Sequence, residues 1–264
     1  MTMQSTLAEF SARFKFRFTH HLLIGLEREH HFTDLAGNIV PIAPQVLAWL
    51  KQYTNGRHVC HGYELSGCQG EERIERPCRL HELDNLMGRN EAELRAAEKA
   101  LSFQRAYWGA APHDMPLDVY PDERYERIVR HWPIERLRAA CRVTGVHVLI
   151  GMSDPETAVR AYNRAIEQFQ YLCELGDSTN GERLQLFRDH LVDCIDPPPY
   201  RNWQHFHERM VERGFATDPR RLWDFIRIST HGAIEFRMFD TTDDWPRIKE
   251  WVRICLNICR NACK

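Results

Sequence analysis

The sequence predicts an α+β protein built on a largely antiparallel β-sheet. Strand-like runs cover residues 15–29, 142–151 and 232–240, whereas long amphipathic stretches with helical spacing cover residues 79–103 and 244–263. These strands and helices do not alternate as regular βαβ units, which a parallel sheet would require. We therefore expect a mixed architecture in which antiparallel strands carry the core.

Shorter elements complete the predicted order. Turn-forming residues at 34–38 predict that the first strand continues over residues 30–40 into a hairpin. Asp154 and Pro155 open a predicted helix at 153–175, because they supply a cap and a first-turn proline. The remaining predictions are a leader segment or helix at 1–14, a helix at 44–53, one or two strands at 58–76, helices at 125–132, 134–141, 182–192 and 203–213, loops at 112–121 and 176–181, a linker or lid at 196–200, and a strand at 222–228.

Composition is that of an ordinary globular chain. The 264 residues are 43% hydrophobic and 27% charged, and the net charge is −2. This length suits one compact domain over residues 1–264. Near-neutral charge gives no indication of a nucleic-acid or membrane partner, and residues 1–13 lack the apolar core of a signal peptide. We expect a cytoplasmic protein.

Nine cysteines are many for such a chain, and without a secretory signal they predict free thiols. Cys255, Cys259 and Cys263 recur every four residues and so share one helix stripe. A metal or cluster site and a packed helix face both fit this spacing.

Acidic side chains interrupt the apolar strands in pairs. Glu27 and Glu29 follow the apolar run 22–26, and Glu235 and Arg237 lie within the run 233–239. Residues i and i+2 of a strand share one face, and buried charges need a partner or a metal. With Glu64, Glu71 and His147, these acids predict a site for Mg²⁺ or Mn²⁺.

Two arginines suit a phosphate or carboxylate near that metal. Arg227 and Arg237 present fixed guanidinium forks. Acids for metal and arginines for phosphate are the requirements of phosphoryl transfer. The chain has no P-loop and no GxGxxG after a strand, so a nucleotide site of those kinds is excluded.

Several motifs together carry a family resemblance. Their order along residues 22–245 resembles that of the second glutamate–cysteine ligase family, which includes bacterial carboxylate–amine ligases. The matching segments are Gly25-Leu-Glu27-Arg-Glu29, Tyr63-Glu64 to Gln69-Gly-Glu71, Gly145-Val-His147-Val-Leu-Ile-Gly151, Gly176 to Arg183, Trp223-Asp-Phe-Ile-Arg227 and Gly232-Ala-Ile-Glu235-Phe-Arg237.

The resemblance implies a glutamine-synthetase-like catalytic fold, in which a curved antiparallel sheet has helices on its convex side. It also implies that ATP phosphorylates a carboxylate, typically that of glutamate, and that an amine then forms the amide. The implied metal ligands are Glu27, Glu29, Glu71, His147 and Glu235. Arg237 and Glu64 are implied in cofactor binding, and the implied catalytic residues that bind phosphate or substrate are Arg237, Arg227 and Arg183.

The sequence departs from the family pattern in three places. Leu149 replaces the second histidine of the His-x-His strand, and residues 169–175 replace a serine-rich stretch. The chain also stops soon after the Glu235 strand, where relatives continue, so we expect a homodimer or a partner chain to complete the site. Two alternatives therefore stay open beside the ligase: a non-catalytic metal- or ligand-binding relative, and a kinase that stops at phosphoryl transfer.

Overall fold

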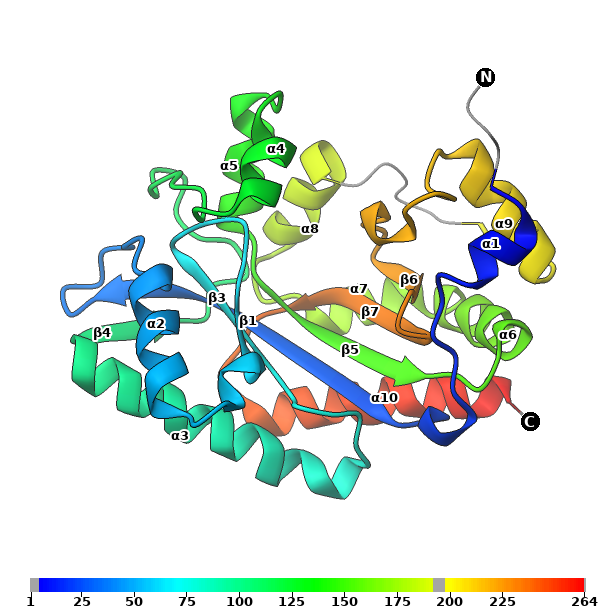
Figure 1. Ribbon diagram of the computed structural model, residues 1–264, viewed down its shortest axis with the longest axis horizontal. Coiled ribbons are helices and arrows are strands. Elements are labelled where there is room, and N and C mark those ends of the chain that lie inside the picture. The colour runs from blue at the N-terminus through cyan, green and yellow to red at the C-terminus, as the bar shows by residue number, and fades with distance from the viewer. Residues whose placement is uncertain (1–4, 192–197, 264) are drawn as a thin grey trace.

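Figure 1 shows the computed structural model, which describes residues 5–191 and 198–263. Its strands form one seven-stranded sheet in the order β2-β3-β1-β5-β7-β6, with β4 pairing beside β1. Each of these pairings is antiparallel, so the predicted α+β class with an antiparallel sheet is confirmed. The strands are β1 (Ile24–Asp34), β2 (His61–Tyr63), β3 (Gln69–Arg73), β4 (Phe103–Ala106), β5 (Gly145–Gly151), β6 (Ile226–Ser229) and β7 (Ala233–Asp240).

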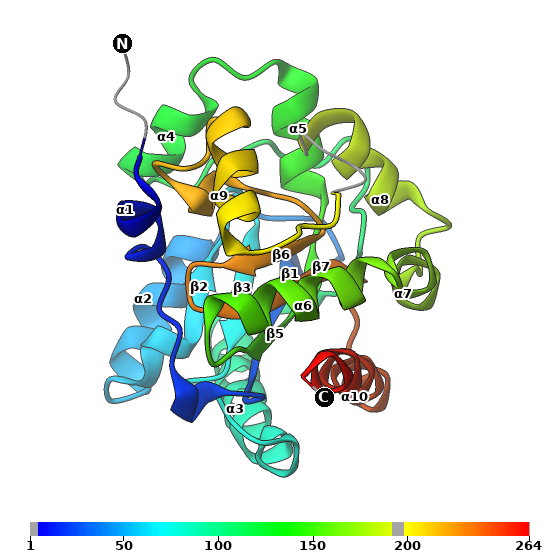
Figure 2. The same ribbon diagram turned by 90° about the vertical axis from the view of Figure 1, so that its right-hand side faces the viewer.

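Helices flank the sheet on both sides. Both views place α3 and α10 on one side, and α4, α5 and α8 on the other (Figures 1 and 2). The α-helices are α1 (Leu7–Ser11), α2 (Ala43–Tyr53), α3 (Leu83–Leu101), α4 (Glu123–Val129), α5 (Ile134–Arg142), α6 (Pro155–Ile166), α7 (Phe169–Gly176), α8 (Glu182–Leu186), α9 (Trp203–Glu212) and α10 (Trp245–Ala262).

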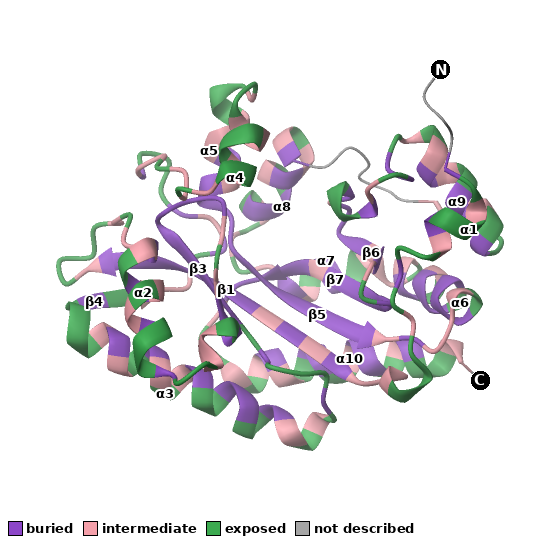
Figure 3. Ribbon diagram, in the orientation of Figure 1, coloured by how far each residue is buried: buried purple, intermediate pink, exposed green. Residues whose placement is uncertain are grey.

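The main core lies between β5, β7 and the helices α6 and α10. Val148 and Phe236 have no exposed surface, and Phe239 stacks on Trp251 of α10 with ring centroids 4.8 Å apart. Burial of this apolar surface is the main source of stability, at roughly 25 cal/mol per Å². Figure 3 shows that the central strands are largely buried. Because side chains alternate along a strand, the residues between these core positions face the opposite side of the sheet.

Several predicted boundaries were wrong. Residues 15–23 are not strand but irregular chain with a short 3-10 turn at Phe18–His20, and β6 begins at Ile226 rather than at 222. The helix predicted at 153–175 is two helices, α6 and α7, and the 79–103 stretch is a 3-10 turn at Leu80–Glu82 followed by an α-helix from Leu83 to Leu101.

Other elements need smaller corrections. Strand β4 was not predicted, and the helix predicted at 182–192 is α8 followed by one π-helical turn, Phe187–Leu191. The 196–200 linker or lid and the 1–14 leader lie partly outside the described residues. In the described ranges, 5–191 and 198–263, the helices lack the combination of length and hydropathy that crossing a bilayer requires.

Candidate metal and phosphate site

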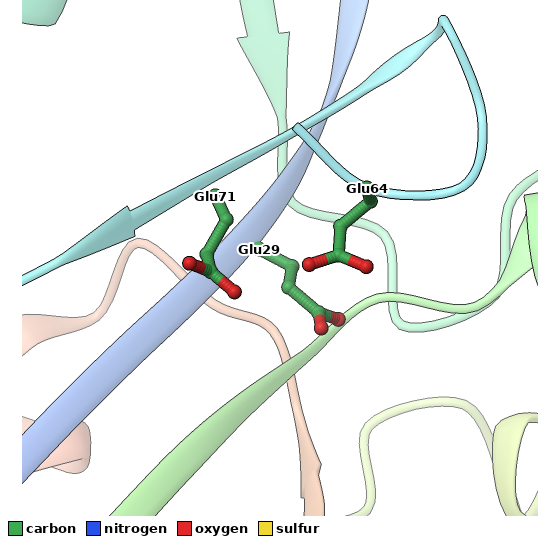
Figure 4. Close-up of side chains that lie close together, drawn as sticks. All are labelled: Glu29, Glu64 and Glu71. Atoms are coloured by element: carbon green, nitrogen blue, oxygen red, sulfur yellow. The ribbon is translucent and has the colours of Figure 1, made fainter. Parts of the chain in front are cut away.

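Three glutamates converge on the face of the sheet opposite α10. Glu29 of β1 lies directly opposite Glu71 of β3 in the strand register, and Glu64 reaches them from the loop between β2 and β3. One carboxylate oxygen of each lies within 4.8 Å of the others (Figure 4). Glu29 and Glu71 are both buried. We call these three residues the glutamate trio.

The backbone of β5 fixes the direction of one trio member. The N–H of Gly145 donates to Oε2 of Glu29 at 2.7 Å. A side chain at position 145 would overlap the guanidinium of Arg183 and approach the Phe239 carbonyl oxygen to 2.8 Å. Glycine is therefore required here so that β5 can approach both Glu29 and β7.

His147 extends the trio towards Glu27. The two residues are register partners on β5 and β1, and Nδ1 of His147 lies 3.3 Å from Oε2 of Glu27. Its Nε2 lies 3.5 Å from Oε1 of Glu29. Burial first, and then the charge of Arg237, lower the pKa of His147 to about 3. The ring is therefore neutral at ordinary pH, as a metal-ligating imidazole must be.

A β-bulge opposite His147 helps to place Arg237. The β5–β7 register shifts between Val146 and Val148, so that β7 has one additional residue there. A bulge of this kind redirects the side chains beside it. Arg237 Nη1 lies 3.5 Å from Nδ1 of His147.

Glu235 is hydrogen-bonded to Arg227 and Arg237, the two arginines predicted to bind phosphate or carboxylate. Arg227 donates through Nε and Nη2 to the two Glu235 oxygens, each at 2.9 Å, and Arg237 Nη1 donates at 2.5 Å. Burial alone would raise the pKa of the Glu235 carboxyl, but Arg227 and Arg237 outweigh it and hold that pKa well below its usual range. The Glu235 oxygens are thus engaged by guanidinium groups, and its role as a metal ligand stays a prediction.

The raised pKa values within the trio favour binding of a further positive charge. Burial, then Glu29 and Glu71, raise the pKa of Glu64 well above its usual value. Burial, then Glu235, raise that of Glu27. Several carboxylates in one buried place cannot all ionise without a counter-charge. An all-oxygen trio beside a neutral imidazole fits Mg²⁺ or Mn²⁺ by donor chemistry.

This pKa pattern predicts that the metal-free protein loses stability as pH rises. Burial, then the charge of Glu27, raise the pKa of Glu71 to about 8, compared with 4.5 for an ordinary glutamate. The folded state binds this proton more tightly than the unfolded chain does. The proton therefore stabilises the fold fully below about pH 4.5, and this stabilisation is lost as the pH rises to about 8. Thermal unfolding without metal should therefore show a midpoint that falls between about pH 6 and pH 8.5.

Added Mg²⁺ should raise that midpoint most at alkaline pH, because the metal binds deprotonated ligands. Glu71→Gln provides the control, since it removes the titrating group and should flatten the decline. An unchanged pH dependence in this variant would contradict the assignment of the effect to the trio.

A cavity of about 430 Å³ opens beside these groups. Besides Glu27, the trio and His147, its lining includes the guanidinium groups of Arg227 and Arg237. Sequence reasoning missed the other polar and aromatic lining residues, which come from the last residues of β2 and β3, from α4 and from residues 220–223, and share no periodic signal. They are Tyr63, Arg73, Arg124, Tyr125, Arg220 and Trp223.

A second cavity, of about 510 Å³, continues past Glu27. Glu27 and Arg73 line both spaces, and Lys15, Arg17 and other basic residues line the second. We call the first the acidic cavity and the second the basic cavity. Leu149 lines the basic cavity, on the same β5 face as His147 but beyond it.

Arg183 lies behind the site. Its side chain is 1% exposed, and its guanidinium donates to the backbone carbonyl oxygens of Arg237 at 3.1 Å and Met238 at 3.2 Å. It therefore supports the bulged part of β7, whereas the predicted catalytic role of Arg183 stays a prediction.

The cysteine stripe of α10 lies on a packed helix face at Cys255 and Cys259, which are buried in the core.

Comparisons with known proteins show distant homology and a shared fold. No family model matches the chain. Over 136 residues it is 26% identical to "Putative glutamate–cysteine ligase 2" of Solibacter usitatus, an alignment that spans 47% of this chain and 35% of that protein.

A crystal structure of a bifunctional glutathione synthetase from Pasteurella multocida superposes on 93% of this chain with a TM-score of 0.62 and 12% identity. The chain covers 40% of that protein, so it spans well under half the length of either relative. The chain is therefore a distant homologue of this "Putative glutamate–cysteine ligase 2", and its antiparallel α+β fold is that of part of the bifunctional glutathione synthetase.

Proposed function

We propose that this chain is an ATP- and Mg²⁺-dependent carboxylate–amine ligase that forms an amide, of the γ-glutamyl type, through an acyl phosphate. The observation that carries the proposal is the meeting of two kinds of group in one cavity. The glutamate trio provides oxygen ligands, and Arg227 and Arg237 provide cationic forks beside it. Phosphoryl transfer needs both, because the protein mainly positions groups and neutralises charge.

The proposed reaction assigns separate tasks to the two cavities. The phosphate chain of ATP binds from the basic cavity, and the carboxylate substrate binds in the acidic cavity near Arg227 and Arg237. Divalent metal held by Glu27, the trio and His147 would neutralise phosphate charge during transfer. These roles rest on the shared lining of Glu27 and Arg73 and on the excess of basic groups beyond them.

The two chemical steps then balance without a protein nucleophile. A carboxylate oxygen attacks the γ-phosphorus, ADP leaves, and an acyl phosphate forms. The amine attacks the acyl carbon, phosphate leaves with the former carboxylate oxygen, and the amine loses a proton. Arg237 lies 3.5 Å from His147 and 2.5 Å from Glu235, where it can stabilise charge on the transferred group.

The substrates we propose are a glutamate-like carboxylate and a small amine, used in the cytoplasm by a homodimer or by a complex with a partner chain. One observation favours the non-catalytic alternative. Leu149 is 9% exposed and puts an apolar side chain on the site face, where the family pattern has histidine. Leu149 therefore offers no polar contact on this face of the site.

Turnover separates the alternatives. Purified protein with ATP, Mg²⁺, glutamate and a pooled set of amino acids and amines should release ADP and yield an amide detectable by mass spectrometry. ADP release without an amine, together with a stable phosphorylated product, would indicate the kinase. Nucleotide binding without ADP release across the whole pool would indicate the non-catalytic relative.

A further inference from the structure

Arg73 is a cation already bound to the glutamate trio. It lies two residues after Glu71 on β3 and opposite Glu27 in the strand register, so all three share one face. Its Nη1 donates to Oε1 of Glu71 at 2.9 Å, and its Nε donates to the Val59 carbonyl oxygen at 3.0 Å. Among the ion pairs of residues 5–191 and 198–263, this is the one that joins an arginine to the trio.

The Arg73–Glu71 ion pair is part of the site, but it can dissociate. The Arg73 side chain is 45% exposed, whereas that of Glu71 is 10% exposed. Gly62 of β2 lies against the pair, since a side-chain carbon there would come within 3.2 Å of Oε1 of Glu71 and 3.6 Å of Nη1 of Arg73. The Glu71 carboxylate is therefore held in place, whereas the Arg73 guanidinium faces solvent on one side and can move away from Glu71.

Arg73 also lies beside the basic cavity, into which its guanidinium can move. It lines both the acidic and the basic cavity. In the basic cavity Arg76 is engaged by Glu82 at 2.6 Å, and the neighbouring Lys15 and Arg17 add positive charge. An anionic phosphate chain in this cavity would lie beside Arg73, and a guanidinium binds phosphate as readily as carboxylate.

We propose that Arg73 is an exchangeable counter-ion: it holds Glu71 in the metal-free protein, and when a divalent cation takes Glu71 it pairs with the phosphate chain of the nucleotide. This inference rests on the proposed function. It adds a residue that couples the two ligands, because the metal releases the group that the nucleotide needs. A cation that competes with the metal weakens metal binding in the absence of nucleotide, and the same cation strengthens nucleotide binding.

The test separates these opposite effects by measuring binding without turnover. Mn²⁺ alone is titrated into the full-length protein and free Mn²⁺ is followed by electron paramagnetic resonance. Arg73→Gln should bind Mn²⁺ about threefold to tenfold more tightly than the wild type, since a competing charge is gone. In the presence of saturating Mg²⁺, the same variant should bind ADP about tenfold more weakly by calorimetry, since a charge-assisted pair is lost.

Two further variants control the comparison. Arg209→Gln removes a side chain that is 40% exposed and paired to Glu212 on α9, away from both cavities, so it matches the charge and the exposure of Arg73. It should leave both affinities unchanged. Arg73→Lys keeps the charge without the fork and should lie between the wild type and Arg73→Gln.

Equal or weaker Mn²⁺ binding by Arg73→Gln would overturn the exchange, because Arg73 would then only support Glu71. Unchanged ADP binding would overturn its second half. Absence of Mn²⁺ binding in both proteins would overturn the inference and the proposed function together. Tighter Mn²⁺ and weaker ADP binding with no amide product from any amine would count against the ligase reaction alone.

Discussion

Replacing Glu29 with glutamine is expected to lower metal-dependent ATP turnover by about a thousandfold while the fold stays intact. Glu29 is the centre of the site: it belongs to the trio, lies 3.5 Å from His147 and accepts the Gly145 N–H at 2.7 Å. Glutamine keeps an oxygen for that hydrogen bond but loses the negative charge with which a carboxylate binds Mg²⁺ strongly. Loss of metal-derived charge stabilisation costs several kcal/mol, and each 1.36 kcal/mol is about tenfold in rate.

The measurement pairs ADP release with Mn²⁺ binding and thermal unfolding. Glu208→Gln makes the same chemical change at an exposed position on α9 and should behave as the wild type. Turnover near the wild-type rate in Glu29→Gln, with Mn²⁺ binding undiminished, would show that the trio does not hold the catalytic metal.

Replacing Arg237 with lysine should lower kcat by about a hundredfold to a thousandfold with little change in metal affinity. The Arg237 fork lines the acidic cavity and is aimed by Glu235 and by the bulge opposite His147. Lysine keeps one positive charge but cannot present two parallel N–H groups to a transferring phosphoryl. The loss of a preorganised donor that acts on developing charge typically has this size.

Comparing the change in kcat with the change in metal affinity distinguishes a catalytic role of Arg237 from a purely structural one. Mn²⁺ affinity and the unfolding midpoint of Arg237→Lys should stay near those of the wild type, because Arg227 still engages Glu235 with two hydrogen bonds. Arg209→Lys on α9 is the matched control. An undiminished kcat, or a loss of activity that follows a loss of folding, would remove Arg237 from the reaction.

Sequence patterns predicted the parts of the site that lie on strands. Glu27 and Glu29, and likewise Glu235 and Arg237, share a face because strand side chains alternate, and the structure brings them beside His147. The strand register was needed to know which side chains lie next to each other. Neither the Glu29–Glu71 pairing nor the bulge between Val146 and Val148 has a local sequence signal.

The parts that sequence reasoning missed depend on tertiary contacts. Glu64 was predicted among the metal-site acids and, from the resemblance, in cofactor binding, and its loop position, which the sequence did not predict, brings it into the trio. The contacts of Arg183 with the carbonyl oxygens of β7 also have no local sequence signal, and its catalytic role stays a prediction. Arg73 is half-exposed and was not predicted as a site residue, because its position between the two cavities depends on the tertiary fold.

Long-range contacts explain one boundary error. The run at 15–23 contains aromatic and basic residues at strand-like frequency, but the Lys15 N–H donates to the Thr230 carbonyl oxygen at 2.9 Å. The chain then turns at Phe18–His20. Local propensity is a weak guide where such contacts decide the path.

The central claim, that a carboxylate is activated by phosphorylation before an amine attacks it, has one direct test. The reaction is run with ATP, Mg²⁺ and a pool of amino acids whose carboxyl oxygens are ¹⁸O-labelled, and the released phosphate is analysed by mass spectrometry. If an acyl phosphate forms and is aminolysed, each phosphate released should carry one ¹⁸O from the carboxylate. Release of unlabelled phosphate with ADP would mean that water, and not a carboxylate, had accepted the phosphoryl group, and would contradict the account.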